Sequence, residues 1–134
     1  MISIEISLRV RYAETEQMGV VYYGNYAQYY EVGRVEVLRH LGLSYREIEE
    51  KGTILPVLSL ECKYIRPARY DDLLRVVTKV EEMPDTRIHF VHEIYNEEGT
   101  LLNLGKVSLV FVDMESGRPR KIPDDVAVLF SPHF

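Results

Sequence analysis

The sequence predicts an α+β fold in which one antiparallel sheet packs around one long helix. Residues 2–11 alternate strictly between apolar and polar side chains, which is the period of a strand with one buried face. From about Asn25 to Leu41 the apolar residues recur at steps of three and four, as on one face of a helix. Four stretches rich in β-branched and aromatic residues then follow with short connections. They span residues 54–66, 73–80, 87–95 and 101–113.

The ends of the helices carry their own signals. Asn25 is expected to cap the start of the long helix, and Gly42 to terminate it. Gly33 inside this helix predicts a close approach to the sheet, because glycine otherwise costs about 1 kcal/mol there relative to alanine. A short second helix is expected over Ser44–Lys51. The tail after Asp113 has one glycine and three prolines, and is expected to be irregular over most of its length.

Composition limits the function classes. The 134 residues are expected to form a single domain, 1–134. A net charge of −5 argues against nucleic-acid binding through bulk charge. The only cysteine, Cys62, excludes an intramolecular disulfide and fits the reducing cytoplasm. The start of the chain does not resemble a signal peptide, and no apolar run approaches the roughly 18 residues of a membrane span.

The segment Val10–Tyr30, VRYAETEQMGVVYYGNYAQYY, holds six of the ten tyrosines of the chain. Two carboxylates, Glu14 and Glu16, fall in the predicted turn between the first strand and the long helix. A carboxylate beside a helix start can place a base next to backbone N–H groups that have no helical acceptor. This combination suits attack on a carbonyl group.

The run Arg11–Tyr26 contains two acidic positions around one residue, then Gly-Val-Val-Tyr, a variable position, Gly, and Asn-Tyr. It resembles the hotdog-fold thioesterases of the 4-hydroxybenzoyl-CoA thioesterase and YbgC-like group, and a second stretch, Tyr64–Asp72, is also similar to that family. The resemblance covers nearly the whole chain. It implies a hotdog fold, in which a five-stranded antiparallel sheet wraps around one long central helix, and hydrolysis of acyl-CoA thioesters without a metal or a redox cofactor.

The resemblance also assigns roles to residues. The family's essential acid falls on Glu16, as a nucleophile or a general base, and the N–H groups of Tyr23 and Gly24 fall where the family polarises the thioester carbonyl. The family usually has Asp at both acidic positions, and glutamate adds about one methylene of reach. The YbgC-like branch often has His at the position of Tyr23, whereas the hydroxybenzoyl branch can have Tyr, so Tyr23 favours the hydroxybenzoyl branch or an aromatic substrate.

CoA carries several phosphate charges, so an acidic enzyme needs local basic residues to bind it. Arg66, Arg69 and Arg87 are the candidates, because arginine binds phosphate in a bidentate manner. The alternative interpretation is that these arginines only keep strand ends soluble. The family also implies a homo-oligomer, either a dimer or a tetramer built as a dimer of dimers, with its sites at the dimer interface.

Each candidate has a simpler interpretation. Glu14 and Glu16 can be solvated loop acids, and the tyrosines can form core or subunit interface. Cys62 alternates with apolar residues, which favours a core thiol over a nucleophile. His89 and His92 are three residues apart in one predicted strand, so they face opposite sides and do not share a metal.

The leading hypothesis is therefore a thioesterase that hydrolyses a short-chain or aromatic acyl-CoA to the free acid and CoA. The alternative is a non-catalytic hotdog protein that binds acyl thioesters without turning them over. A hotdog hydro-lyase ranks last, because it needs a histidine near the acid and Val10–Tyr30 contains none.

Overall fold

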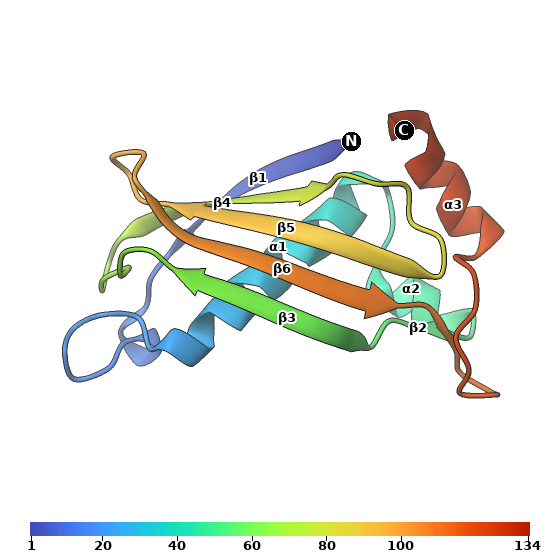
Figure 1. The fold of residues 1–134 in the computed structure, drawn as a ribbon, viewed down its shortest axis with the longest axis horizontal. Helices are drawn as coiled ribbons and strands as arrows, with labels where there is room; N and C mark the ends of the chain where they lie inside the picture. The colour runs from blue at the N-terminus through green and yellow to red at the C-terminus, as the bar shows by residue number, and fades with distance from the viewer.

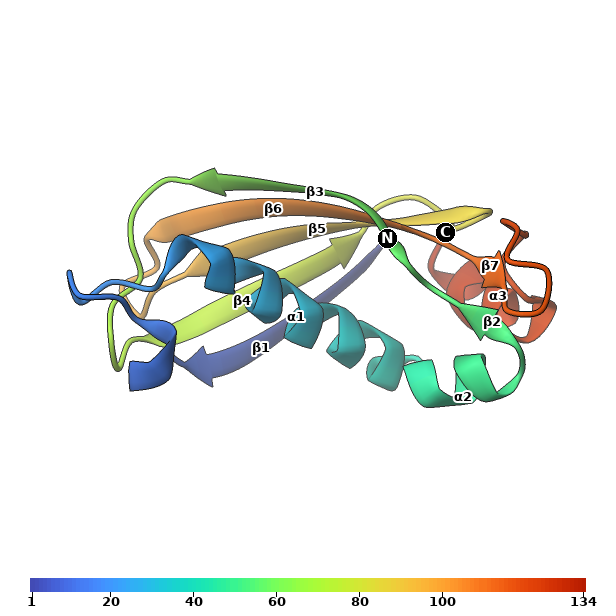
Figure 2. The same cartoon turned by 90° about the horizontal axis from the view of Figure 1, so that it is seen from below.

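The computed structural model describes residues 1–134 and contains a five-stranded antiparallel sheet with the strand order β1-β4-β5-β6-β3 (Figure 1). Its strands are β1 (Ile2–Arg9), β3 (Val57–Tyr64), β4 (Leu73–Val80), β5 (Arg87–Tyr95) and β6 (Leu101–Val110). The long helix α1 (Tyr26–His40) lies along one face of this sheet (Figure 2). The predicted arrangement of one antiparallel sheet around one principal helix is confirmed.

Two glycines allow α1 to lie close to the sheet. A Cβ atom on Gly33 would lie 2.2 Å from Thr78 Oγ1, and one on Gly105 of β6 would lie 2.3 Å from the ring of Tyr30. Because the backbone of Gly105 leaves room, the Tyr30 ring reaches the sheet and stacks on His92, with ring centroids 4.7 Å apart. The close approach predicted from Gly33 is therefore present.

Two of the predicted strands are interrupted. The stretch 54–66 begins as β2 (Thr53–Ile54), breaks at Leu55 and Pro56, and resumes as β3. The stretch 101–113 divides into β6 and β7 (Val112–Asp113), and β7 pairs with β2 in a separate two-stranded sheet. Proline has no N–H to donate to a strand ladder, which explains the break before β3.

The C-terminal tail is more ordered than the sequence predicts. It contains α3 (Asp124–Phe130), which buries Val126 and Phe130, so the expectation of an irregular tail is wrong here. Pro123 stands at the N-cap, where its missing N–H removes no helical hydrogen bond.

The helix α2 (Tyr45–Glu50) confirms the predicted short helix. The Ser44 hydroxyl accepts a hydrogen bond from the Glu47 N–H at 3.2 Å. Gly42 follows α1 with a φ of +83°, in the left-handed region expected of a glycine that ends a helix.

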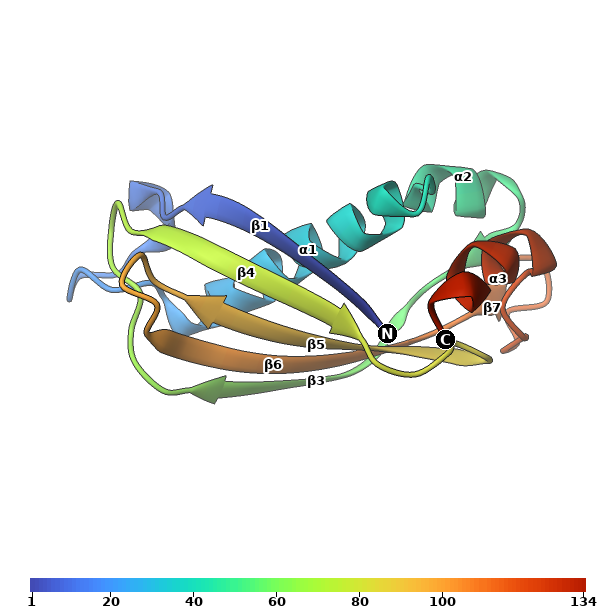
Figure 3. The same ribbon diagram turned by 90° about the horizontal axis from the view of Figure 1, so that it is seen from above.

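The two ends of α1 have different surroundings. The short 3₁₀ turn Tyr23–Asn25 precedes α1, and the loop between β3 and β4 lies at the same end of the molecule (Figures 2 and 3). At the opposite end, α2 and α3 lie together beyond the sheet (Figure 3). None of the helices combines the length and the apolar composition needed to cross a bilayer.

One edge of the main sheet is open and apolar. Strand β3 pairs only with β6. Its inward-facing row was expected to be buried, yet Leu60 is 44% and Tyr64 52% exposed, and only Cys62 between them is partly buried. Within one chain, this part of the sheet is only partly covered, because Tyr30 reaches Cys62 and Tyr26 contacts the ring of Tyr64.

Candidate active site

Glu14 is a structural residue of the turn that follows β1. The residue is 9% exposed, and its carboxylate accepts hydrogen bonds from the Arg11 N–H at 2.8 Å and from the Tyr29 hydroxyl at 3.1 Å. The Arg11 guanidinium lies 3.5 Å from its second oxygen. Burial, followed by the negative charge of Glu14, raises the pKa of Tyr29 well above its usual value, so this hydroxyl stays a donor. Both oxygens of Glu14 are thus engaged inside the chain.

Glu16 has the opposite environment. Its backbone is fixed in a tight loop, in which its N–H donates to the Val20 carbonyl and its carbonyl accepts from the Gly19 N–H, each at 2.9 Å. Its Oε1 is buried from solvent and has no hydrogen-bond partner. A buried carboxylate oxygen without a donor is costly, and its lone pairs remain available to a substrate or a water molecule. Of the two acids, Glu16 is the one that is free to react.

The start of the helix supplies unused donors. The N–H groups of Tyr23 and Gly24 take no part in loop, turn or side-chain hydrogen bonds, and no earlier helical carbonyl is available to them. The dipole of the 15-residue helix that follows adds positive potential at this end. Two N–H groups with this environment can stabilise an oxyanion.

Asn25 differs from its predicted role. Its side chain does not cap the helix. Instead, Asn25 Nδ2 donates to the Glu14 carbonyl at 2.8 Å, and the Tyr22 N–H donates to the same oxygen at 3.0 Å. These two bonds attach the acidic loop to the start of the helix, so they hold Glu16 in the same part of the molecule as the free N–H groups.

A hollow of about 270 Å³ lies at this end of α1. Its lining comes from the helix start and from the end of β3 with the loop that follows: Val21, Tyr23, Tyr26, Tyr64, Ile65, Arg66 and Pro67. The ring of Tyr64 meets Tyr23 and Tyr26 edge to face, with centroids 6.3 and 5.6 Å apart. Of the predicted site residues, Tyr23 and Arg66 line this hollow, whereas Glu16 and Gly24 lie on the segments beside it.

The three candidate arginines do not converge within one chain. Arg69 is exposed in the loop next to Arg66, where its backbone bridges to Val20 of the acidic loop. Arg87 is at the start of β5, opposite Val110, and therefore at the other end of the sheet. One chain thus presents two of the predicted phosphate ligands beside the hollow and the third far from it.

Tyr64 is not among the site residues predicted from the sequence. Its hydroxyl donates to the Tyr23 carbonyl at 3.1 Å. The thiol of Cys62, by hydrogen bonding, is the main cause that raises the pKa of Tyr64 to about 12. The only signal for Tyr64 in the sequence is that it opens the second stretch shared with the thioesterases.

Cys62 is held in a polar cluster under α1. The Tyr30 hydroxyl lies 3.0 Å from Cys62 Sγ, and Asn103 Nδ2 donates to the same sulfur at 3.3 Å. The Tyr30 hydroxyl also donates to Asn103 Oδ1. These contacts agree with the interpretation of Cys62 as a core thiol.

The two histidines of β5 lie on opposite faces of the strand, as their spacing predicts. His92 is fully buried and its Nδ1 lies 2.9 Å from Thr78 Oγ1. His89 is exposed and bonds to Ser108 at 2.7 Å on the other face. They cannot hold one metal ion together.

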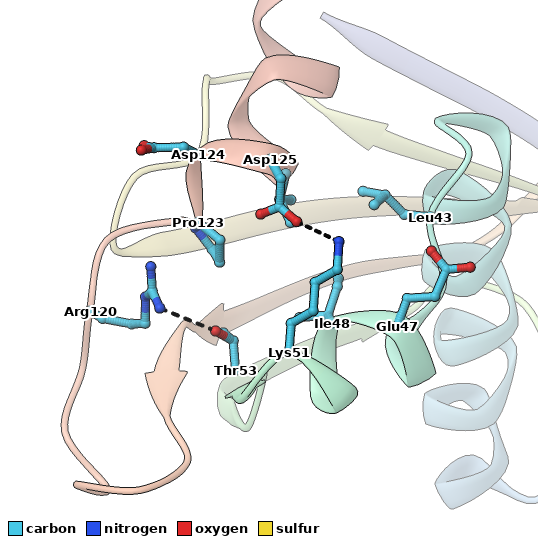
Figure 4. Close-up of a pocket in the computed structure, with 10 residues that line it drawn as sticks. Leu43, Glu47, Ile48, Lys51, Thr53, Arg120, Pro123, Asp124 and Asp125 are labelled. Carbon is cyan, nitrogen blue, oxygen red and sulfur yellow. Dashed lines mark hydrogen bonds and ion pairs between the residues drawn. The ribbon is translucent and has the colours of Figure 1, made fainter.

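A larger hollow, of about 390 Å³, lies between α2 and α3 at the far end of α1 (Figure 4). Leu43, Ile48 and Val126 are among its apolar lining residues. Two of its charged side chains have partners: Lys51 Nζ lies 2.8 Å from Asp125 Oδ2, and Arg120 Nη1 lies 3.5 Å from Thr53 Oγ1. None of the predicted site residues lies here.

Comparison with known proteins identifies the family. Residues 10–130 match the profile of the Thioesterase-like superfamily. The chain belongs to this superfamily.

Individual relatives agree with this assignment. The protein YneP of Bacillus subtilis is 38% identical over 112 residues, which are 84% of this chain and 81% of that protein. The acyl-CoA thioester hydrolase YbgC of Escherichia coli is 36% identical over 123 residues, 92% of each chain. The crystal structure of DHNA-CoA thioesterase from Staphylococcus aureus superposes with a TM-score of 0.93 at 34% identity, covering 99% of this chain and 91% of that one. The fold is the hotdog fold of these thioesterases.

Proposed function

We propose that this protein hydrolyses acyl-CoA thioesters to the free acid and CoA, with Glu16 as the reacting carboxylate. The observation that carries the proposal is the buried, unpartnered Oε1 of Glu16, in a loop that is hydrogen-bonded to a helix start with two unused N–H groups. The family membership and the thioester hydrolase YbgC at 36% identity support the same reaction.

The chemistry needs only groups that this chain contains. Glu16 either attacks the thioester carbonyl carbon, to form an anhydride, or removes a proton from a water molecule that attacks it. The carbonyl oxygen gains negative charge, and the N–H groups of Tyr23 and Gly24 donate to it. The C–S bond then breaks, and CoA leaves as the thiolate. In the general-base route the free acid is released directly, and the proton that Glu16 took from water passes to the thiolate. In the nucleophilic route a water molecule hydrolyses the anhydride, which releases the free acid, regenerates the Glu16 carboxylate and supplies the proton to the thiolate.

Tyrosine rings at the hollow support an aromatic or short acyl group as the substrate. Tyr23, Tyr26 and Tyr64 offer ring faces and edges, which pack favourably against another flat ring. A hollow of about 270 Å³ is near the lower limit for small-molecule sites, so a long acyl chain fits less well. Arg66 and Arg69 are proposed to bind CoA phosphates.

The active form is proposed to be a homodimer, or a tetramer of two such dimers. The open β3 edge and its exposed apolar residues favour pairing with a second β3. Antiparallel pairing would bring the Arg87 end of one sheet toward the Arg66 end of the other, so that all three arginines could serve one site. Size-exclusion chromatography with light-scattering detection measures the mass of the protein in solution and tests the proposed oligomer. A monomer with full activity would contradict it.

We also propose that residues 1–134 act as one domain, in the cytoplasm, where a lone thiol stays reduced.

The decisive experiment is a panel of short-chain, branched and aromatic acyl-CoAs assayed by detection of the free CoA thiol. Glu16→Gln, which preserves size and removes the charge, is expected to lower kcat by about 10³-fold or more, since a catalytic carboxylate is lost. Glu47→Gln, at the far hollow, is the matched control and should retain wild-type turnover. An unchanged rate in Glu16→Gln would refute the assignment of Glu16. An absence of turnover on every thioester would instead favour the non-catalytic binding protein.

A further inference from the structure

The peptide group between Tyr23 and Gly24 joins a held carbonyl to a free N–H. A peptide group is planar and trans, so its C=O and N–H point in opposite directions. The C=O belongs to Tyr23 and accepts a hydrogen bond from the Tyr64 hydroxyl at 3.1 Å. The N–H belongs to Gly24 and has no acceptor. Whatever holds the Tyr23 carbonyl therefore also sets the direction of the Gly24 N–H.

We propose that Tyr64 is a positioning residue, whose hydroxyl holds the Tyr23 carbonyl and thereby aims the Gly24 N–H at the thioester carbonyl oxygen. The inference rests on the proposed function and adds a residue to its machinery. The hydrogen bond from Tyr64 has a second effect. A bond accepted by the carbonyl polarises the peptide group, which makes its N–H a stronger donor.

Tyr64 is itself fixed on several sides. Its ring contacts Tyr23 and Tyr26 edge to face, and the thiol of Cys62 raises the pKa of its phenol to about 12. Tyr30 and Asn103 hold Cys62 in the sheet below. A hydroxyl that stays protonated can donate at any pH at which a thioester is assayed.

The variant Tyr64→Phe isolates this effect because it keeps the ring and removes only the hydroxyl. Its edge-to-face contacts with Tyr23 and Tyr26 can persist, and the side chain is half exposed, so the fold is expected to survive. Removal of one oxyanion donor typically costs 10² to 10³ in kcat. Misdirecting one donor should cost less, so we expect kcat to fall about 10- to 50-fold while KM changes by less than about twofold.

Tyr70→Phe is the matched control. Tyr70 lies in the loop after β3, is exposed to a similar extent, and its hydroxyl makes no hydrogen bond. It is expected to retain the wild-type kcat. Equal losses in both variants, an unchanged kcat in Tyr64→Phe, or a rise in KM that accounts for the whole loss would overturn the proposal.

A vibrational measurement separates positioning from a general loss of structure. Benzoyl-CoA labelled with ¹³C at its carbonyl is bound to Glu16→Gln, and the stretch of that carbonyl is followed by isotope-edited difference spectroscopy. The band is expected at a lower frequency than in free benzoyl-CoA, and to move back toward the free value in the double variant Glu16→Gln/Tyr64→Phe. A band that does not move between these two variants would refute the role of Tyr64. The readout needs binding only, so it remains decisive even if the protein turns out not to hydrolyse thioesters.

Discussion

The two hollows at the ends of α1 differ in whether their polar groups have hydrogen-bond or ion-pair partners. Between α2 and α3, a lysine pairs with an aspartate and an arginine contacts a threonine. At the start of the helix, a buried carboxylate oxygen and two N–H groups remain without partners. The larger hollow is the one with the paired groups. Size is therefore a poor guide to chemistry in this molecule, and unpaired polar groups are the better one.

Leaving buried polar groups unpaired costs stability. Of the two ends of α1, only the start of the helix leaves a buried side-chain oxygen without a partner. The acidic loop shows this within three residues, because Glu14 is fully engaged whereas one oxygen of Glu16 is not. A folded chain tends to violate pairing rules where it binds or reacts with a substrate. The contrast between the two ends can be tested by separating stability from activity.

The largest effect is expected from the two neighbouring glutamates, with opposite outcomes. Glu14→Ala leaves the Arg11 N–H and the Tyr29 hydroxyl without their acceptor, and should lower the free energy of unfolding by about 2 kcal/mol. Glu16→Ala removes an unpartnered buried oxygen, so stability should be unchanged or higher while turnover is lost. Urea unfolding followed by circular dichroism measures both variants. If Glu16→Ala were as destabilising as Glu14→Ala, the carboxylate of Glu16 would be structural.

The core around the middle of α1 holds three further unpartnered buried atoms, Nε and Nη1 of Arg34 and Nε2 of His92. Burial, together with the positive charge of Arg34, lowers the pKa of His92 to about 3. In the unfolded chain the group titrates near 6.5, so below that pH the unfolded state binds a proton that the folded state does not. Stability should therefore fall as the pH drops from about 6.5 toward 3, at about 1.4 kcal/mol per pH unit from this group.

Between pH 7 and pH 5 the histidine should cost about 2 kcal/mol of folding free energy, beyond the effect of other groups. Urea titrations at the two pH values measure the loss, and His92→Gln should reduce it by that amount. His89→Gln, on the exposed face of the same strand, should leave it unchanged. Because His92 lies between the two ends of α1, its titration should destabilise both ends together. If acid unfolded only one end of α1, this prediction would be wrong.

The spacing of apolar residues along the sequence was sufficient to predict most of the fold. The alternation of residues 2–11, the helical stripe from Asn25 to Leu41 and the place of Gly33 all correspond to observed features. The wrong predictions concern residues that are compatible with two local structures. Pro123 contributes to the prediction of an irregular tail, but proline is equally suited to a helix start. Pro56 interrupts a stretch whose side chains otherwise favour one continuous strand.

The residue types of the site could be predicted from the sequence, but the hydrogen bonds between its side chains could not. The sequence indicates that two glutamates precede a helix, and the resemblance selects Glu16, but which acid is engaged depends on Arg11 and Tyr29 in the folded chain. Asn25 was expected to cap its own helix and instead bonds to Glu14, eleven residues earlier. Tyr64 was not selected because its hydrogen bond to Tyr23 spans 41 residues. Such contacts depend on the tertiary structure, which the local periodicity of apolar residues in the sequence does not reveal.

The smallest effect is expected at the far hollow. Lys51 and Asp125 are both exposed, and their pairing raises the pKa of Lys51 and lowers that of Asp125. Exposed ion pairs add little to stability, because water screens the charges and two flexible side chains must be held in place. In Lys51→Met, NMR titration should show the pKa of Asp125 return toward its usual value, while turnover and the urea midpoint stay near those of the wild type. A loss of turnover in Lys51→Met would mean that the paired groups of this hollow take part in the reaction, and the distinction between the two ends of α1 would fail.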